Sequence, residues 1–183
     1  MEKIEIEIKG ETPYLMHAFP MTKADEKETK RPGISDYTKE VEESLYRLPD
    51  GKIYVPSTQI QGSLIEAGKN FQIPGKKKST YSGLIGGLLI ITPDAIIINP
   101  QEFVIDRRSV VVPATRGRVI RERPKFNNWS LKFNIENLEE DGIPNTTVKK
   151  ILDYAGSYIG IGDFRPKKKG PFGRFIVTKF KEV

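Results

Sequence analysis

The chain has 183 residues, enough for one domain with a buried core. It contains no cysteine and one histidine, His17, which excludes disulfide scaffolds, thiolate zinc sites, cysteine nucleophiles and an all-histidine metal site within one chain. We therefore expect no cofactor and no metal. Because no apolar run approaches the length of a membrane span and the alternating start is unlike a signal peptide, we expect a cytoplasmic protein without membrane contact.

The net charge of +6 is unevenly distributed along the chain. Residues 1–50 carry 8 lysines and arginines against 12 acids, a net charge of −4. The remaining residues carry 22 against 12, a net charge of +10. A basic body favours a polyanionic partner such as nucleic acid, although a solvated basic surface would give the same count.

The first third of the chain predicts a strand, an insertion and a short helix. Residues 3–9 alternate charged residues with isoleucine, as a half-buried strand does. After a proline-containing loop, the polar residues 22–35 indicate a mobile insertion. Residues 36–47 predict an amphipathic helix with Val41 and Leu45 directed inward.

A hairpin and a longer helix are predicted next. Asp50-Gly51 lies between two apolar segments and favours a tight hairpin turn. Ser57 is predicted to cap a helix that buries Ile60, Leu64 and Ala67 on one face.

The second half of the chain predicts mainly strands. Residues 84–98 contain two apolar runs separated by Thr-Pro-Asp and predict a second hairpin. Residues 103–112 and 128–136 predict further strands, and in the latter Trp129 and Phe133 are expected in the core. Asn145 or Thr146 can cap a helix over 147–157, and the chain ends in another strand.

This order of elements predicts a single α+β domain over residues 1–183. Helices are expected on one face of an antiparallel sheet. A modified ferredoxin-like arrangement, as in RNA-recognition modules, is the simplest solution, and the additional β-hairpins would be insertions.

Residues 160–175 form a glycine-rich loop with several cations. Glycines let backbone N–H groups approach a phosphate closely, lysine and arginine neutralise it, and an aromatic ring can stack on a base. Such a loop is expected to lie outside the core. The alternative to binding is a turn that connects the last helix to the last strand, with solvated lysines. The loop lacks the GxxxxGK[ST] phosphate-binding motif. The candidate nucleic-acid-binding residues here are Gly160, Gly162, Arg165, Lys167, Lys168, Lys169, Gly170, Phe172, Gly173 and Arg174.

Two further segments add candidate cations. The predicted basic insertion at about 107–125 contains six arginines, whose planar groups suit phosphate. Because side chains alternate along a strand, about half of them would face the ligand. The alternative is ion pairing with the acidic N-terminal third. These candidates are Arg107, Arg108, Arg116, Arg118, Arg121 and Arg123, and an exposed basic loop adds Lys76, Lys77 and Lys78.

His17 and Asp106 are the residues whose chemistry would allow a catalytic or a metal-binding role. His17 follows the first strand and is a possible general acid or base for RNA cleavage. A packing or hydrogen-bonding role is the more common one for such a residue. Asp106, next to Arg107, is interpreted as a paired surface residue rather than a metal ligand.

Three stretches resemble the RAMP superfamily, the RNA-binding proteins of CRISPR systems. GIGDFRPKKKGPFGRF resembles its glycine-rich loop, YVPSTQIQGSLIEAG (54–68) its element entering the first helix, and EIEIKGETPYLM its opening strand and loop. Ser57-Thr58-Gln59 replaces the usual Gly-Ser-Ser. The whole also resembles small phage and archaeal proteins near the RAMP backbone subunits. The resemblance implies a modified RNA-recognition fold that holds the sugar-phosphate backbone and assembles side by side along a strand.

Three functions remain open from the sequence. The first is non-catalytic, largely sequence-independent binding of single-stranded RNA or DNA, with self-association into a filament or ring and contacts to other subunits of a ribonucleoprotein complex. The second is a metal-independent endoribonuclease that uses His17. The third is a viral or structural scaffold protein. Cleavage assays on the His17→Ala variant would separate the first two, and a binding titration would separate the third.

Overall fold

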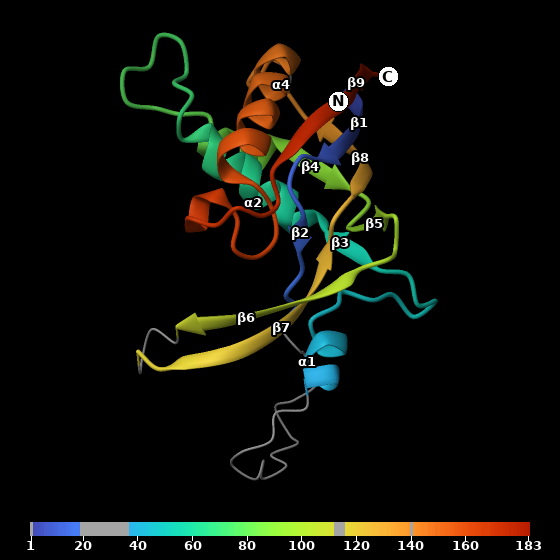
Figure 1. The fold of residues 1–183 in the computed structure, drawn as a ribbon. Coiled ribbons are helices and arrows are strands. Elements are labelled where there is room, and N and C mark those ends of the chain that lie inside the picture. Colours follow the sequence, from blue (N-terminus) through green and yellow to red (C-terminus); the bar gives the residue numbers. More distant parts are fainter. Residues whose placement is uncertain (1, 19–36, 112–115, 140) are drawn as a thin grey trace, which may run out of the picture.

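The computed structural model describes residues 2–18, 37–111, 116–139 and 141–183. It is an α+β fold with two antiparallel sheets and helices (Figure 1). The insertion predicted at 22–35 lies outside the described residues.

In the main sheet, strand β1 (Glu2–Gly10) lies between β8 (Ser130–Asn137) and the edge strand β9 (Phe175–Glu182). Both neighbours pair with it in antiparallel fashion. Alternation in the sequence buries the isoleucines of β1 on one face and leaves charged residues on the other. The apolar pairs across β1 and β8 are Ile4 with Ile135, Ile6 with Phe133, and Ile8 with Leu131.

The other edge of β8 is shared by two short strands. β4 (Leu89–Thr92) pairs with residues 134–137, and β5 (Ala95–Asn99) pairs with Ser130 and Leu131. β3 (Tyr54–Pro56) then pairs with β5. The hairpin predicted over 84–98 is therefore wrong, since β4 and β5 lie along β8 instead of pairing with each other.

The apolar run before β4 is helical rather than extended. Helix α3 (Ser82–Leu88) packs on α2 (Ser57–Gly68) and buries Ile85. A short apolar run does not distinguish a strand from a buried helix by its periodicity, and here packing against α2 selects the helix.

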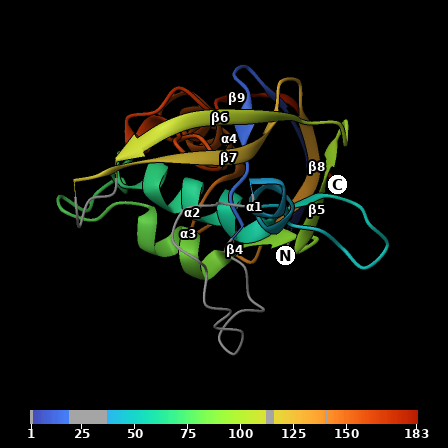
Figure 2. The ribbon, with the colours of Figure 1, turned by 60° about the horizontal axis from the view of Figure 1, so that its bottom comes forward.

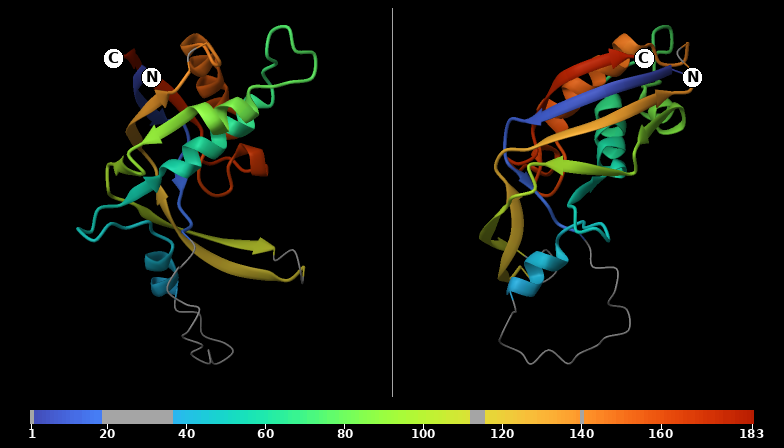
Figure 3. Two further views of the ribbon diagram at one scale, coloured as in Figure 1. Left: turned by 180° about the vertical axis from the view of Figure 1, so that it is seen from behind. Right: turned by 90° about the vertical axis from the view of Figure 1, so that its right-hand side faces the viewer.

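Helices α2 and α4 (Asn145–Tyr154) pack together against the main sheet (Figure 3). The apolar face of α2 was predicted from its spacing: Ile60, Leu64 and Ala67 are fully buried. The turn η1 (Ala155–Ile159) continues α4. The core therefore lies between this helical layer and the isoleucine-rich face of β1.

Neither predicted cap forms, because each polar side chain has a partner elsewhere. Ser57 is the first residue of α2, and its hydroxyl donates to Asp94 at 2.7 Å. Asn145 begins α4, and its amide donates to Glu2 at 2.5 Å. These contacts join the two helix starts to neighbouring elements.

The second sheet is mainly a long hairpin that projects from the body (Figures 1 and 2). Its arms are β6 (Val104–Val111) and β7 (Arg118–Phe126), and we call this pair the ribbon. β2 (Tyr14–Leu15) pairs with the base of β7, and α1 (Tyr37–Glu43) packs against β7. The basic insertion predicted at 107–125 corresponds to this ribbon.

The base of the ribbon is anchored in the core by aromatic residues. Phe126 is fully buried, and its ring lies 6.1 Å from that of Tyr14 and 5.7 Å from that of Phe103. Trp129 and Phe133 on the following segment are buried, as expected from the sequence. The arginines are thus carried on a hairpin whose base is rigidly held.

None of the helices in the described part of the chain combines the length and apolar character needed to cross a bilayer.

Candidate nucleic-acid interface

A cleft with a volume of about 470 Å³ lies between the glycine-rich loop and helix α2. His17, just after β2, contributes to its wall. The other lining residues are Thr58, Gln59, Gly62, Ser63 and Glu66 from α2, and Ile161, Gly162, Asp163, Arg165, Lys167 and Lys168 from the loop.

The glycines of the loop allow it to pack against the rest of the protein. Gly173 has a φ of 73°, and a Cβ atom there would overlap the carbonyl oxygen of Ile161. Its N–H donates to the carbonyl of Pro13 at 2.8 Å. The expectation that the loop lies outside the core is therefore wrong at this end, where Ile161, Phe172 and Gly173 are buried.

Phe172 does not offer its ring for stacking on a base. It is buried, and the guanidinium carbon of Arg108 lies 4.7 Å from its ring centroid. The exposed aromatic residue of the loop is Phe164, with a relative accessibility of 38%. Phe164 was not among the expected binding residues, because three phenylalanines in one polar loop give no signal of which ring is exposed.

Three of the loop cations hold the loop together. Arg165 donates to the carbonyl of Gly162 at 2.9 Å, and Arg174 donates to the carbonyl of Ser157. Lys167 pairs with Glu66 of α2. Lys168 and Lys169 are exposed. The loop therefore uses some of its cations for internal contacts and presents others to solvent.

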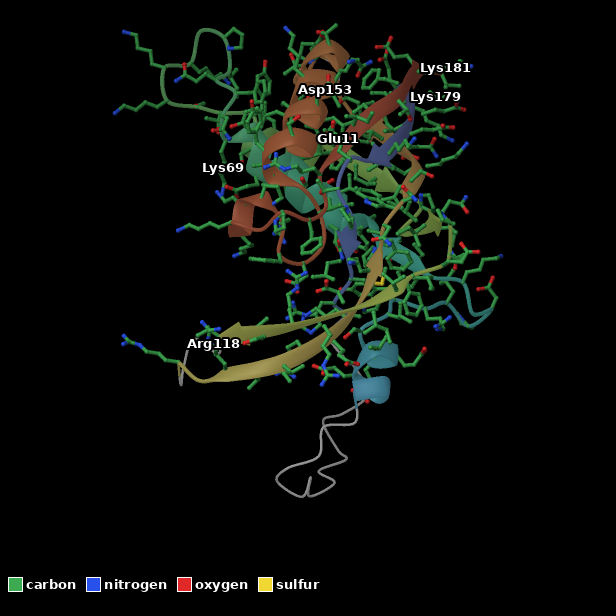
Figure 4. All side chains as sticks on the ribbon, viewed as in Figure 1. Glu11, Lys69, Arg118, Asp153, Lys179 and Lys181 are labelled. Atoms are coloured by element: carbon green, nitrogen blue, oxygen red, sulfur yellow. The ribbon has the colours of Figure 1, made fainter. Side chains whose placement is uncertain are left out.

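The arginines of the ribbon divide between its two faces. Cross-strand pairing places Asp106 opposite Arg123 and Arg108 opposite Arg121, so these four side chains share one face. Arg107, opposite Glu122, and Arg118, opposite Val111, belong to the other face. Arg118 extends outward near the tip of the ribbon (Figure 4). Arg116, beside the tip, is exposed.

Acids of the same chain pair with most of these arginines. Arg108 donates twice to Asp106, at 2.5 and 2.6 Å, and these contacts raise the pKa of Arg108. Asp106 is thus paired, as expected, but it is buried rather than at the surface. Arg107 lies 3.5 Å from Glu122.

Two more arginine pairs tie the ribbon to other elements. Arg121 pairs with Glu40 of α1 at 2.8 Å, which fits the predicted pairing with the acidic N-terminal third. Arg123 lies 2.6 Å from Asp163 of the glycine-rich loop. The ribbon and the loop, predicted separately as binding segments, are therefore held beside each other.

His17 lies beside the same ion pair. Its Nδ1 atom is 3.7 Å from Asp163, and its side chain is 45% exposed. Burial, together with the positive charge of Arg123, lowers the pKa of His17 below its ordinary value, although Asp163 acts in the opposite direction. The imidazole is therefore neutral at neutral pH. The described ranges contain no group of three or more His, Asp or Glu side chains arranged for a metal ion.

Lys76, Lys77 and Lys78 are exposed on a loop beyond α2. The loop is closed by a bridge between Gln72 and Thr80. In Figures 1 and 3 it projects at the end of the molecule opposite the ribbon. The predicted cations therefore form separate groups: the ribbon tip, the glycine-rich loop and this lysine loop.

The chain resembles known proteins in its three-dimensional fold rather than in its sequence. No family model and no curated protein matches the chain, whereas 67 chains of solved structures do. The similarity is therefore one of fold.

One of these is a chain in the cryo-EM structure of the Type III-B Cmr-beta bound to cognate target RNA. The TM-score is 0.57 at 15% sequence identity, and the match covers 100% of this chain and 60% of that chain. The likeness is consistent with the RAMP-type fold implied by the sequence resemblance.

Proposed function

We propose that the protein binds single-stranded nucleic acid, RNA in the first place, along its sugar-phosphate backbone without cleaving it. The observation that carries this proposal is the set of exposed cations, Lys168 and Lys169 beside the cleft and Arg116 and Arg118 near the tip of the ribbon. The similar solved chain belongs to a structure that contains target RNA, which supports RNA as the ligand. Exposed lysine and arginine would neutralise phosphates regardless of base sequence.

The topology supports the same proposal. Along the chain, β1, α2, β4, β8, α4 and β9 follow the order β-α-β-β-α-β, and the strands are adjacent in the order β4-β8-β1-β9. We interpret this as a ferredoxin-like core of the type used by RNA-recognition modules, with the ribbon as an insertion.

Assembly along the strand is part of the proposal. The face of the ribbon that carries Arg107 and Arg118 also exposes Ile105, Val111 and Ile120. Exposed apolar side chains flanked by charges are typical of protein contacts. Further copies, or other subunits of a ribonucleoprotein complex, would contact this face. Light scattering with RNA of increasing length tests this, and a particle that stays monomeric on every length excludes side-by-side assembly.

A binding titration tests the proposed function. Affinity for labelled RNA should fall by orders of magnitude between about 50 and 200 mM salt, because counterions are released on binding. Arg118→Glu should weaken binding, whereas Asp153→Lys, an exposed change on α4 away from the cleft, should not. Absence of binding to RNA and to single-stranded DNA would refute the proposal and leave a structural scaffold role.

Endoribonuclease activity is the second candidate, because His17 is neutral and lies in the cleft. A neutral imidazole can accept the proton of a ribose hydroxyl. We expect purified protein to leave RNA intact with and without divalent metal. Cleavage that His17→Ala abolishes would establish the endoribonuclease instead.

A further inference from the structure

The chemistry of the cleft differs from that of a phosphate site. Two carboxylates, Asp163 and Glu66, line it together with the neutral polar side chains of Thr58 and Gln59. A phosphate presents only acceptors and is repelled by carboxylates, whereas the edge of a nucleobase presents donors and acceptors side by side. A wall that combines acids, an amide and cations therefore suits a base better than a backbone phosphate.

We propose that this cleft receives one unpaired nucleobase of the bound strand, with guanine as the preferred base. The inference rests on the proposed function and adds a preference at one position to a path that is otherwise independent of sequence. A volume of about 470 Å³ is within the range of pockets that take small organic groups.

The hydrogen-bonding groups of the cleft match guanine. Oδ2 of Asp163 is ion-paired with Arg123, which leaves Oδ1 as an acceptor, and the N2 amino group of guanine is a donor that Oδ1 can receive. Tyr14 donates to Oε1 of Gln59 at 2.9 Å, which leaves the Gln59 amide nitrogen as a donor. Lys168 supplies a further donor for the O6 and N7 acceptors of guanine.

Gly62 is an independent indication that the cleft is occupied. It lies inside helix α2, where glycine costs roughly 0.5–1 kcal/mol relative to alanine. A Cβ atom at this position would meet nothing within 4 Å, so packing does not require glycine there. Because Gly62 lines the cleft, its missing side chain keeps the space open for a ligand.

His17 completes the site on the other side. Its imidazole lines the cleft and is held neutral by burial and by Arg123. A neutral aromatic ring at the wall of a pocket can stack on an inserted base.

The test uses short uridine RNA oligonucleotides with a single central guanine, adenine, cytosine or inosine. We expect guanine to bind about tenfold more tightly than uridine at that position. Inosine, which lacks the N2 amino group, should lose most of this preference. Gly62→Leu fills the cleft and should abolish the preference while binding of the all-uridine strand persists. Gly83→Leu is the matched control. Gly83 lies on α3, a Cβ atom there would also meet nothing within 4 Å, and the residue does not line the cleft.

Asp163→Asn provides a second variant that keeps the side-chain shape and an acceptor for Arg123. It should also remove the guanine preference. Equal affinity for all four central bases, or a preference that survives in Gly62→Leu, would overturn the inference and leave backbone binding intact. Failure of every oligonucleotide to bind would refute the proposed function and this inference together.

Discussion

The guanidinium of Arg108 lies over the ring of Phe172, with 4.7 Å between the guanidinium carbon and the ring centroid. The contact joins the ribbon to the glycine-rich loop, and the ion pair between Arg123 and Asp163 joins them a second time. A partly buried cation–π contact of this kind contributes on the order of 1 kcal/mol. Together these contacts set the position of the ribbon relative to the cleft.

Replacement of Phe172 tests this connection. Because the ring is buried, Phe172→Ala should lower the free energy of unfolding by about 2–4 kcal/mol. Phe164→Ala, in the same loop but with 38% exposure, is the control and should cost less than half as much. Urea denaturation of the two variants measures the difference. Equal losses of unfolding free energy would contradict a stabilising role of the buried ring.

Gly173 should tolerate no side chain. A Cβ atom would overlap the carbonyl oxygen of Ile161, and the φ of 73° adds strain. Gly173→Ala should therefore lower the free energy of unfolding by at least about 2 kcal/mol more than the backbone strain at a positive φ would by itself. The control is Gly75→Ala. There φ is 77°, but a Cβ atom would meet nothing within 4 Å, so that only the backbone strain applies. Similar melting temperatures for both variants would show that the loop can move away.

The lysine loop should contribute to RNA binding through charge alone. Replacing Lys76, Lys77 and Lys78 by alanine should reduce the slope of log affinity against log salt by about 2, since each phosphate contact to a single strand contributes roughly 0.7. The control replaces Lys132, Lys179 and Lys181 on the main sheet, two of which pair with Glu7 and Glu5. An unchanged slope in the first variant would place the lysine loop off the path of the strand.

His17 should make stability depend on pH. Its pKa in the folded protein is below the ordinary value of 6.5, so the unfolded chain binds the proton first as the pH falls. Stability should consequently decrease on acidification through about pH 6.5 and rise again toward neutral pH. In His17→Gln this part of the pH dependence should vanish. Denaturation at several pH values with both proteins measures it, and identical profiles would show that His17 titrates normally.

Several elements follow from the sequence because one face of each is apolar. The alternation in residues 3–9 identifies β1, and the spacing of Ile60, Leu64 and Ala67 identifies the buried face of α2. The same local pattern correctly places Trp129 and Phe133 in the core. The clustering of cations in the glycine-rich loop and on the ribbon is also visible in the sequence, and the loop is one of the two elements that form the cleft.

Only the tertiary structure decides which of these residues are free to act. Ribbon arginines form ion pairs with Asp106 on the ribbon itself and with the distant residues Glu40 and Asp163. The ring of Phe172, also far away in the chain, packs against Arg108. The apolar run before β4 becomes a helix because α2 packs on it, and the cleft exists because the loop folds back beside α2. Local patterning determines which face of an element is buried, whereas the pairing of charges and the shape of a cleft depend on neighbours that the order of residues does not reveal.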